Sequence, residues 1–293
     1  MKEGNASIET DTKIIYTISI TKESSRKTKH VDVTEEPFNI LVSGLDTTGD
    51  IGTTSRSDVN MIVTVNPTTH QILLTSIPRD YYVTLSSKNA KDKLTHSGLY
   101  GVEETVSTVE DFMGIDINYY VKVNYSTITK LVDAIGGIDI DSPYGFTTHG
   151  MSDHYTFKKG QNHLNGSMAL AYSRERQSWP DGDLRRNENQ QIIIEAIIKK
   201  ASNSTTILTD YTSILNSIEE NLSTDMSQKD IKSLIKMQLK DMPGWTIEKQ
   251  AIKGESASRM SYALGANTSV VLPDEALIAA AVDKISQVKG AAE

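Results

Sequence analysis

The most informative absence in this 293-residue chain is cysteine, of which it has none. The chain therefore has no disulfide, no thiolate metal ligand and no cysteine nucleophile. It also lacks any run of about 18 apolar residues, the length that a membrane-spanning helix needs. The first residues, Met1 to Asn5, contain no apolar core of a signal peptide.

Positive charge is also scarce, because 30 Lys and Arg stand against 38 Asp and Glu and the net charge is −8. General nucleic-acid binders are usually basic, so we expect no nucleic-acid partner. The Gly-Lys-Ser/Thr ending of a phosphate-binding loop is missing beside Gly49 and Gly52, which argues against ATP use. Ser43-Gly44 does not belong to a Gly-x-Ser-x-Gly nucleophile elbow.

Three apolar, β-branched runs dominate the first third of the chain and predict buried strands: 38–42, 59–65 and 71–77. Between the second and third runs, residues 66–69 read Asn-Pro-Thr-Thr, which is turn chemistry. A turn this short forces an antiparallel pair.

Charged side chains stand at the ends of these three runs. Asp46 follows the first run, Arg56 and Asp58 precede the second, and Arg79 and Asp80 follow the third. Carboxylates coordinate hard cations such as Mg²⁺, and arginine forks grip phosphate through paired hydrogen bonds. Each residue alone fits a solvated loop with surface ion pairs. As a set at strand ends, where α/β sheets place ligands, they favour an oxyanion site.

A second charged segment, residues 172–186, contains four arginines within its last thirteen residues. In an extended segment Arg174 and Arg176 point the same way. Arg186 lies near the start of a helix that runs through Gln190, and helix N-termini favour anions. The segment can close on a phosphate, or it can be a solvated basic loop paired with its own acidic neighbours.

Strands and helices intermix along the chain. Three- and four-residue apolar spacings predict helices near 99–112, 128–135, 192–198 and 274–288, whereas 141–166 is predicted as a loop. We expect an α/β fold with three α/β/α layers and a mixed central β-sheet flanked by helices.

Three short motifs carry a resemblance to a known family. In order they are Gly44-Leu45-Asp46, Arg56-Ser57-Asp58 and residues 76–80, Ser-Ile-Pro-Arg-Asp. In sequence and spacing the chain resembles the LytR-CpsA-Psr (LCP) family of Gram-positive bacteria. The resemblance implies a cell-wall glycopolymer ligase, a phosphotransferase that moves a glycopolymer from a polyprenyl-pyrophosphate carrier onto peptidoglycan.

The resemblance also implies roles for individual residues. Asp46 and Asp58 would hold Mg²⁺ or Mn²⁺, and Arg56, Asp58 and Arg79 would be catalytic. The set that it assigns to pyrophosphate binding is Arg56, Arg79, Lys93, Arg174, Arg176, Asp183, Arg186 and Gln190.

Family members begin with a cytoplasmic tail and a membrane helix. We therefore expect this chain to be a soluble fragment, the extracellular portion, with its N-terminal anchor absent from the chain. It would act at the extracytoplasmic face of the cell membrane of a Gram-positive bacterium. Residues 1–35 would be an N-terminal arm or the remnant of an accessory domain, and residues 36–293 the LCP catalytic domain.

Several alternatives stay open. The polymer can be capsule, wall teichoic acid or a similar glycan. The same site can serve a polyprenyl-pyrophosphate phosphatase, or a non-catalytic protein that binds lipid precursors or attenuates expression. Either Asp58 or Asp80 can be the general base. The apolar helices from Ile192 onward can be ordinary core or the wall of a channel for a polyprenyl tail.

Overall fold

A mixed six-stranded sheet forms the centre of the computed structural model, which describes residues 29–149, 153–180 and 182–290. In spatial order its strands are β11 (Leu222–Thr224), β6 (Tyr119–Val123), β1 (Phe38–Leu45), β2 (Ser57–Asn66), β3 (Gln71–Ile77) and β12 (Thr246–Ala251). The β1–β6 and β3–β12 pairs are parallel and the other pairs are antiparallel. The predicted mixed sheet is therefore confirmed.

The three strands predicted in the first third of the chain are all present, and β3 has the predicted ends. The turn between β2 and β3 is closed by Asn66, whose side-chain oxygen accepts the backbone N–H groups of Thr68 and Thr69. Gln71 pairs with Asn66 across the hairpin. Local turn chemistry thus sets the register of the two central strands.

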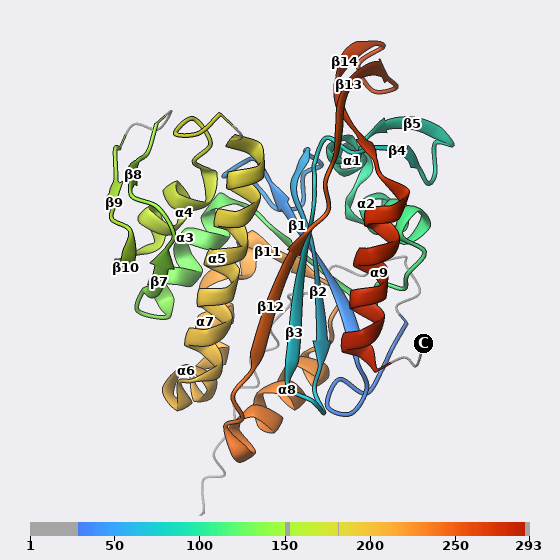
Figure 1. The fold of residues 1–293 in the computed structure, drawn as a ribbon. Coiled ribbons are helices and arrows are strands. Elements are labelled where there is room, and N and C mark those ends of the chain that lie inside the picture. The colour runs from blue at the N-terminus through green and yellow to red at the C-terminus, as the bar shows by residue number, and fades with distance from the viewer. Residues whose placement is uncertain (1–28, 150–152, 181, 291–293) are drawn as a thin grey trace, which may run out of the picture.

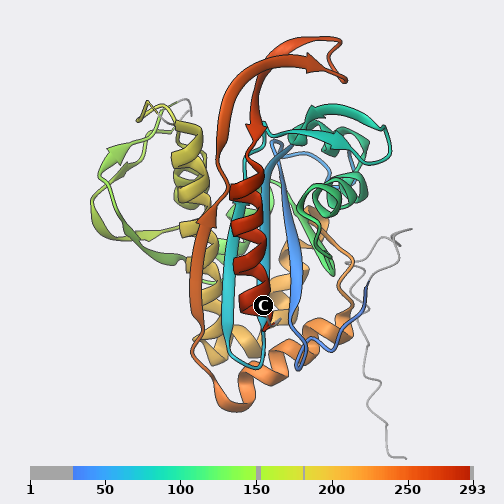
Figure 2. The ribbon, with the colours of Figure 1, turned by 45° about the vertical axis from the view of Figure 1, so that its right-hand side comes forward.

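Helices cover both faces of the sheet, as Figures 1 and 2 show. On one face lie α2 (Val102–Met113) and α9 (Glu275–Lys289). On the other lie α3 (Tyr125–Ala134), α4 (Gly166–Arg174), α5 (Gly182–Ser202) and α8 (Gln228–Asp241). Shorter helices complete the described chain: α1 (Leu94–Ser97), η1 (Gly98–Tyr100), α6 (Thr205–Thr209), α7 (Tyr211–Ile218) and η2 (Glu219–Asn221).

Alternation along the strands divides the core between the two faces. Ile62 of β2 packs in the cluster that contains Ile285 of α9. Its neighbours Met61 and Val63 pack on the opposite face, where Ile194 of α5 joins them. Burial on both faces explains why β2 is an almost uninterrupted apolar run.

Helix ends follow signals in the sequence. Gly114 ends α2 in the left-handed conformation, with φ of 65°. The side chains of Ser227 and Asp274 cap the first turns of α8 and α9. The helix predicted from residue 99 instead begins at Val102, because Leu99 belongs to the short turn η1.

The loop predicted for residues 141–166 is wrong. This segment contains the end of β7 (Ile138–Ser142) and the strands β8 (Phe146–Thr147), β9 (Thr156–Phe157) and β10 (Gly160–Leu164). β10 pairs antiparallel with β7, and β8 pairs with β9. The strands form because distant partners meet, whereas the local sequence carries the Gly, His and Asn of a loop.

A projecting hairpin, β13 (Gly254–Ser261) and β14 (Ala266–Pro273), was not predicted. It rises above the sheet beside a smaller hairpin, β4 (Tyr82–Leu85) and β5 (Ala90–Lys93) (Figures 1 and 2). The hydroxyl of Tyr82 donates to the carbonyl of Met260 at 2.8 Å and joins the two hairpins.

A buried polar cluster strengthens this junction. Asp92 is fully buried and accepts hydrogen bonds from Ser261 Oγ at 2.7 Å and from the Ala263 N–H at 2.8 Å. His96 Nδ1 lies 2.8 Å from the same carboxylate. Burial would raise the pKa of Asp92, but these hydrogen bonds lower it below its ordinary value.

The depressed pKa gives a testable pH dependence. The Asp92 carboxylate stabilises the folded chain fully above the ordinary pKa of about 3.9, and this contribution is lost as the pH falls below that value. We expect Asp92→Asn to lower the free energy of unfolding at pH 7 by about 2 kcal/mol. Below about pH 4 the gap between variant and unaltered chain should narrow. Chemical denaturation at several pH values measures this difference in the free energy of unfolding. A difference that stays constant with pH would show that the charge of Asp92 does not cause it.

Residues 1–28, most of the predicted N-terminal arm, lie outside the described residues. Among the residues that are described, no helix has both the length and the apolar character to cross a bilayer.

Candidate active site

A cavity of about 280 Å³ lies between the sheet and helices α3, α4 and α5. One end is polar and the remainder is apolar. The polar lining comprises Asp46, Asp58, Asn124, Tyr125, Ser173, Arg174, Arg176, Arg186, Arg79 and Gln190. Four guanidinium groups and two carboxylates therefore share one opening.

Sheet topology explains why these side chains converge. β1 and β6 run parallel with Gly44 opposite Val123, so the residues that follow them lie at one edge of the sheet. Asp46 comes directly after β1, and Tyr125 follows β6. β2 begins at this edge and β3 ends there, which brings Asp58 and Arg79 to the same place.

Asp58 and Arg79 form the centre of the polar end. Arg79 Nη1 donates to Asp58 Oδ2 at 2.8 Å, and Thr95 Oγ1 donates to Asp58 Oδ1 at 2.9 Å. The backbone N–H of Thr95 donates to the Arg79 carbonyl. Lys93 Nζ lies 3.0 Å from Asp80 Oδ1, so the structure places it beside Arg79 but outside the cavity lining. Sequence reasoning missed Thr95.

Arg186 is buried and Arg79 is partly buried. Arg186 is 7% exposed, and the Nε atoms of Arg79 and Arg186 have no hydrogen-bond acceptor among the described residues. Burial, and then the positive charge of Arg79, lower the pKa of Arg186. Burial would also lower the pKa of Arg79, but Asp58 and Asp80 raise it overall. Buried positive charge of this kind is stabilised by a bound anion.

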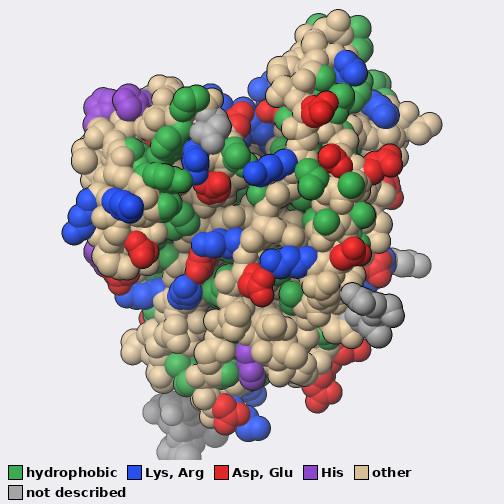
Figure 3. All heavy atoms as spheres, in the orientation of Figure 1, with side chains coloured by type: hydrophobic (Ala, Val, Ile, Leu, Met, Phe, Trp, Pro, Cys, Tyr) green, Lys and Arg blue, Asp and Glu red, His purple; other side chains and the backbone are tan. Residues whose placement is uncertain are grey.

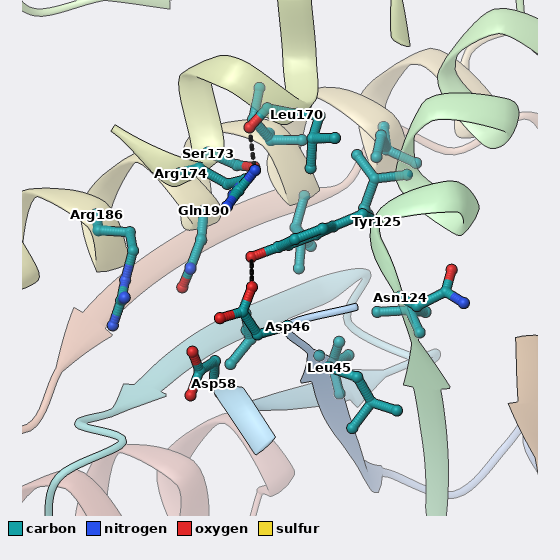
Figure 4. A pocket seen from close by; sticks show the side chains of 18 of the residues that line it. Leu45, Asp46, Asp58, Asn124, Tyr125, Leu170, Ser173, Arg174, Arg186 and Gln190 are labelled. Atoms are coloured by element: carbon teal, nitrogen blue, oxygen red, sulfur yellow. Dashed lines mark hydrogen bonds between the residues drawn. The ribbon is translucent and has the colours of Figure 1, made fainter. Parts of the chain in front are cut away.

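Tyr125 connects the two walls of the cavity. Its hydroxyl donates to Asp46 Oδ1, and the Arg174 guanidinium lies 4.2 Å from the centre of its ring. Figure 4 shows the ring between these two side chains, with Asp58, Arg186 and Gln190 around the same opening. Burial, and then the hydrogen bond to Asp46, raise the pKa of Tyr125. The phenol therefore stays protonated and keeps donating to Asp46.

Tyr125 was missed from the sequence, although a signal exists. Asn124 caps α3 by accepting the N–H of Thr127, and Thr127 Oγ1 accepts the N–H of Asn124 in return. A capping box directly after a strand marks the sheet edge where Asp46 also lies. The signal becomes usable only once β6 is known to pair with β1.

The second charged segment is arranged differently from the prediction. Arg174 is the last residue of α4 rather than part of an extended segment, and its C-cap, Glu175, is extended. Arg174 and Arg176 nevertheless both line the cavity. Asp183 stands at the rim, 3.4 Å from Arg186 and 3.7 Å from Arg176. As predicted, Arg186 lies in the first turns of a helix, α5.

Arg56 is the exception among the predicted arginines. It is exposed just before β2 and does not belong to the cavity lining. The neighbouring hydroxyl of Ser57 is buried and bonded to Ser43 at 2.8 Å. The Arg-Ser-Asp motif thus places Asp58 inside and Arg56 at the surface.

The apolar part of the cavity is walled by isoleucines of α5 and by side chains of α3. Ile194, Ile197 and Ile198 line the cavity and are only partly buried. Ile128 and Leu131 face them from α3. An apolar chain with a phosphorylated end fits a cavity that has one cationic end and one apolar end.

The carboxylates of Asp46 and Asp58 are the groups in the cavity that could hold a metal. The described residues contain no group of three or more His, Asp or Glu side chains able to hold a metal by themselves. Mg²⁺ is commonly held by one or two carboxylates together with phosphate oxygens and water. Two carboxylates beside a phosphate-sized arginine cluster fit that arrangement.

Comparison with known proteins identifies the family. The sequence model of the LytR_cpsA_psr family matches residues 8–281. This chain belongs to that family. The structure also resembles a crystal structure of B. subtilis TagV, with a TM-score of 0.73, 29% identity and coverage of 88% of this chain and 99% of that one. The family resemblance and the α/β fold expected from the sequence are therefore confirmed.

Two relatives have named activities. A protein of Enterococcus faecalis, 37% identical over 73% of this chain and 70% of its own length, is named polyisoprenyl-teichoic acid–peptidoglycan teichoic acid transferase TagU. A Bacillus mycoides protein of the same name is 38% identical over 66% of this chain. The match spans 62% of that relative's length.

Proposed function

We propose that this chain is a transferase that moves a teichoic-acid-type glycopolymer from a polyprenyl-pyrophosphate carrier onto peptidoglycan. The names of the two relatives support the reaction and favour teichoic acid over capsule. The observation that carries the proposal is the cavity itself. Its four arginines suit a pyrophosphate, and its isoleucine-rich wall suits the attached prenyl chain.

The reaction is a phosphoryl transfer. A sugar hydroxyl of peptidoglycan attacks the phosphorus that bears the glycan, forming a new P–O bond. The bridging P–O bond breaks, and polyprenyl phosphate leaves with its electron pair. The hydroxyl proton passes to a base, for which Asp58 and Asp80 both remain candidates.

The arginines contribute by stabilising charge. Arg186 is buried and the Nε atom of Arg79 is buried, so their interaction with phosphate oxygens is weakly screened by water. Arg174 is oriented by the Tyr125 ring, and Arg176 approaches from beyond α4. A divalent cation held by Asp46 and Asp58 would supply further neutralisation of the pyrophosphate. We propose Mg²⁺ or Mn²⁺ for this role.

We further propose that the chain acts at the extracytoplasmic face of the membrane, attached through an N-terminal anchor outside these 293 residues. The division into an arm of residues 1–35 and a catalytic domain of residues 36–293 is part of the same proposal. The family membership supports the proposed location, whereas the division at residue 35 stays a prediction.

Product analysis tests the proposed reaction. Purified protein is given polyprenyl-pyrophosphate-linked glycan, Mg²⁺ and a peptidoglycan oligosaccharide, and the products are separated by mass spectrometry. We expect a phosphodiester-linked conjugate of the two glycans together with polyprenyl phosphate. Free glycan phosphate as the main product would assign a phosphatase instead. Binding without metal-dependent turnover would assign a non-catalytic binder or attenuator.

Tyr125→Phe tests the connection between the two walls. The variant keeps the ring beneath Arg174 but loses the hydroxyl that donates to Asp46. Because hydrogen bonds to charged groups contribute about 1.5–3 kcal/mol, we expect transfer to fall by roughly tenfold or more. Steady-state rates measure this, with denaturation curves to verify folding. Unchanged rates over a range of Mg²⁺ concentrations would show that the hydroxyl does not position Asp46.

A further inference from the structure

The end of the β13–β14 hairpin carries exposed apolar side chains. Leu99, Tyr100, Met260, Tyr262 and Leu264 are each 37–54% exposed and account for most of the large exposed hydrophobics in the described chain. Residues 99 and 100 belong to the neighbouring turn η1, and Tyr262 lies close enough to Tyr100 to contribute to raising its pKa, after burial. We call these five residues the hairpin-tip patch.

Three exposed basic side chains surround the end of the hairpin. Lys88, Lys91 and Arg259 are exposed, and Lys88 Nζ lies 4.4 Å from the centre of the Tyr100 ring. Within residues 82–93 and 258–268 the single acidic residue is Asp92, which is buried. In a chain of net charge −8, this part of the surface is therefore locally cationic.

The patch is held in a fixed position. Asp92, at 0% exposure, accepts hydrogen bonds from Ser261 and Ala263 at the hairpin end, and Tyr82 bonds to the backbone of Met260. Burying a carboxylate is costly unless several donors satisfy it. The buried, hydrogen-bonded carboxylate of Asp92 therefore fixes the end of the hairpin, whose apolar side chains stay exposed to solvent.

The patch is also joined to the candidate active site. β5 carries Lys91 at its exposed side, and Lys93 two residues later forms the ion pair with Asp80. Asp80 in turn lies 3.6 Å from Arg79. In Figure 3 the hairpin projects beside a hollow where basic and acidic side chains gather, and the hairpin itself carries hydrophobic, basic and acidic side chains.

We propose that the hairpin-tip patch docks onto the surface of an anionic lipid membrane. Met260, Tyr262 and Leu264 enter the interfacial layer, while Lys88, Lys91 and Arg259 face lipid phosphates. Tyrosine, aliphatic and basic side chains together are the composition that membrane interfaces select. A glycan offers no hydrocarbon phase to Met and Leu, so peptidoglycan fits the patch less well. The role of this membrane contact rests on the proposed function: it would bring the cavity to a polyprenyl carrier that resides in the bilayer.

The test is cosedimentation of the purified chain with vesicles of phosphatidylglycerol and phosphatidylcholine that contain no polyprenyl lipid. We expect binding that weakens as salt is raised. The triple variant Met260→Ser, Tyr262→Ser, Leu264→Ser should bind at least ~10-fold more weakly. Lys88→Ser and Lys91→Ser should each cost roughly fivefold.

Leu277→Ser is the matched control, because Leu277 is 43% exposed on α9 and lies outside the patch. It should bind as the unaltered chain does, and denaturation curves should show all variants folded. Failure of the unaltered chain to bind vesicles, or equal binding by the triple variant, would overturn the proposal. The proposal would also be overturned if the triple variant bound vesicles normally but no longer bound isolated peptidoglycan.

The triple variant and Arg79→Ala together distinguish this proposal from the proposed transferase reaction. Arg79→Ala should lose transfer and keep vesicle binding. The triple variant should keep transfer on a water-soluble, short-tailed substrate. Vesicle binding that disappears in Arg79→Ala as well would place the lipid contact in the cavity rather than at the patch.

Discussion

We expect Arg79→Ala to lower the rate of glycopolymer transfer by roughly 10²–10³-fold. Arg79 is bonded to Asp58, faces the cavity and has a buried Nε without an acceptor in the described chain. A guanidinium in that position can strengthen its hold on phosphate oxygens as charge develops on them. Arg79→Lys keeps the charge but not the fork, and should recover only part of the rate.

Arg185→Ala is the matched control for Arg79. Arg185 projects from α5 next to Arg186, but it contacts Glu188 at 2.8 Å and the ring of Tyr144 instead of the cavity. Because Arg185 is partly buried but does not line the cavity, its removal should leave the rate within about twofold in a folded protein. Transfer by Arg79→Ala at the unaltered rate, in a folded protein, would exclude Arg79 from the reaction.

The second large effect is expected from filling the apolar part of the cavity. Ile194→Phe with Ile197→Phe places two larger rings in a space of about 280 Å³. If the prenyl chain lies there, a long-tailed substrate must displace the added atoms, at a cost of about 1–3 kcal/mol per site. We expect kcat/KM for a long-tailed substrate to fall by roughly 100-fold or more.

A short-tailed substrate provides the internal comparison, because its tail does not reach the filled region. It should react with the double variant at nearly the unaltered rate. Ile192→Phe controls for bulk on the same helix, since Ile192 is also half-buried but does not line the cavity. Equal losses for long and short tails would show that the isoleucines serve packing and not the carrier chain.

The local sequence pattern was sufficient to predict strands and helices whose partners are near in the chain or whose ends carry capping residues. β3 was predicted with its observed ends, and α9 begins after its cap Asp274. The hairpin β13–β14 escaped detection because a single residue of the eight in β13 is buried. Without a buried face a strand has no period-two apolar signal.

The site residues also divide into those that the sequence pattern predicts and those that only the folded chain reveals. Asp46, Asp58 and Arg79 were found because each directly follows or precedes an apolar run. Thr95 and Tyr125 complete the site through strands and turns that meet only in the folded chain. Arg56 shared the motif with Asp58, but Arg56 precedes the first residue of β2, and the structure leaves it exposed.

The sequence by itself determined the chemistry available to this protein: arginines and carboxylates at strand ends, no thiols, and the motifs of its family. Tertiary structure alone decided which arginines line one cavity and whether the isoleucines of α5 are core or cavity wall. The reason is physical. A helix face has the same apolar period whether it meets a packed neighbour or an open space, and the position of the facing elements decides which of the two it meets.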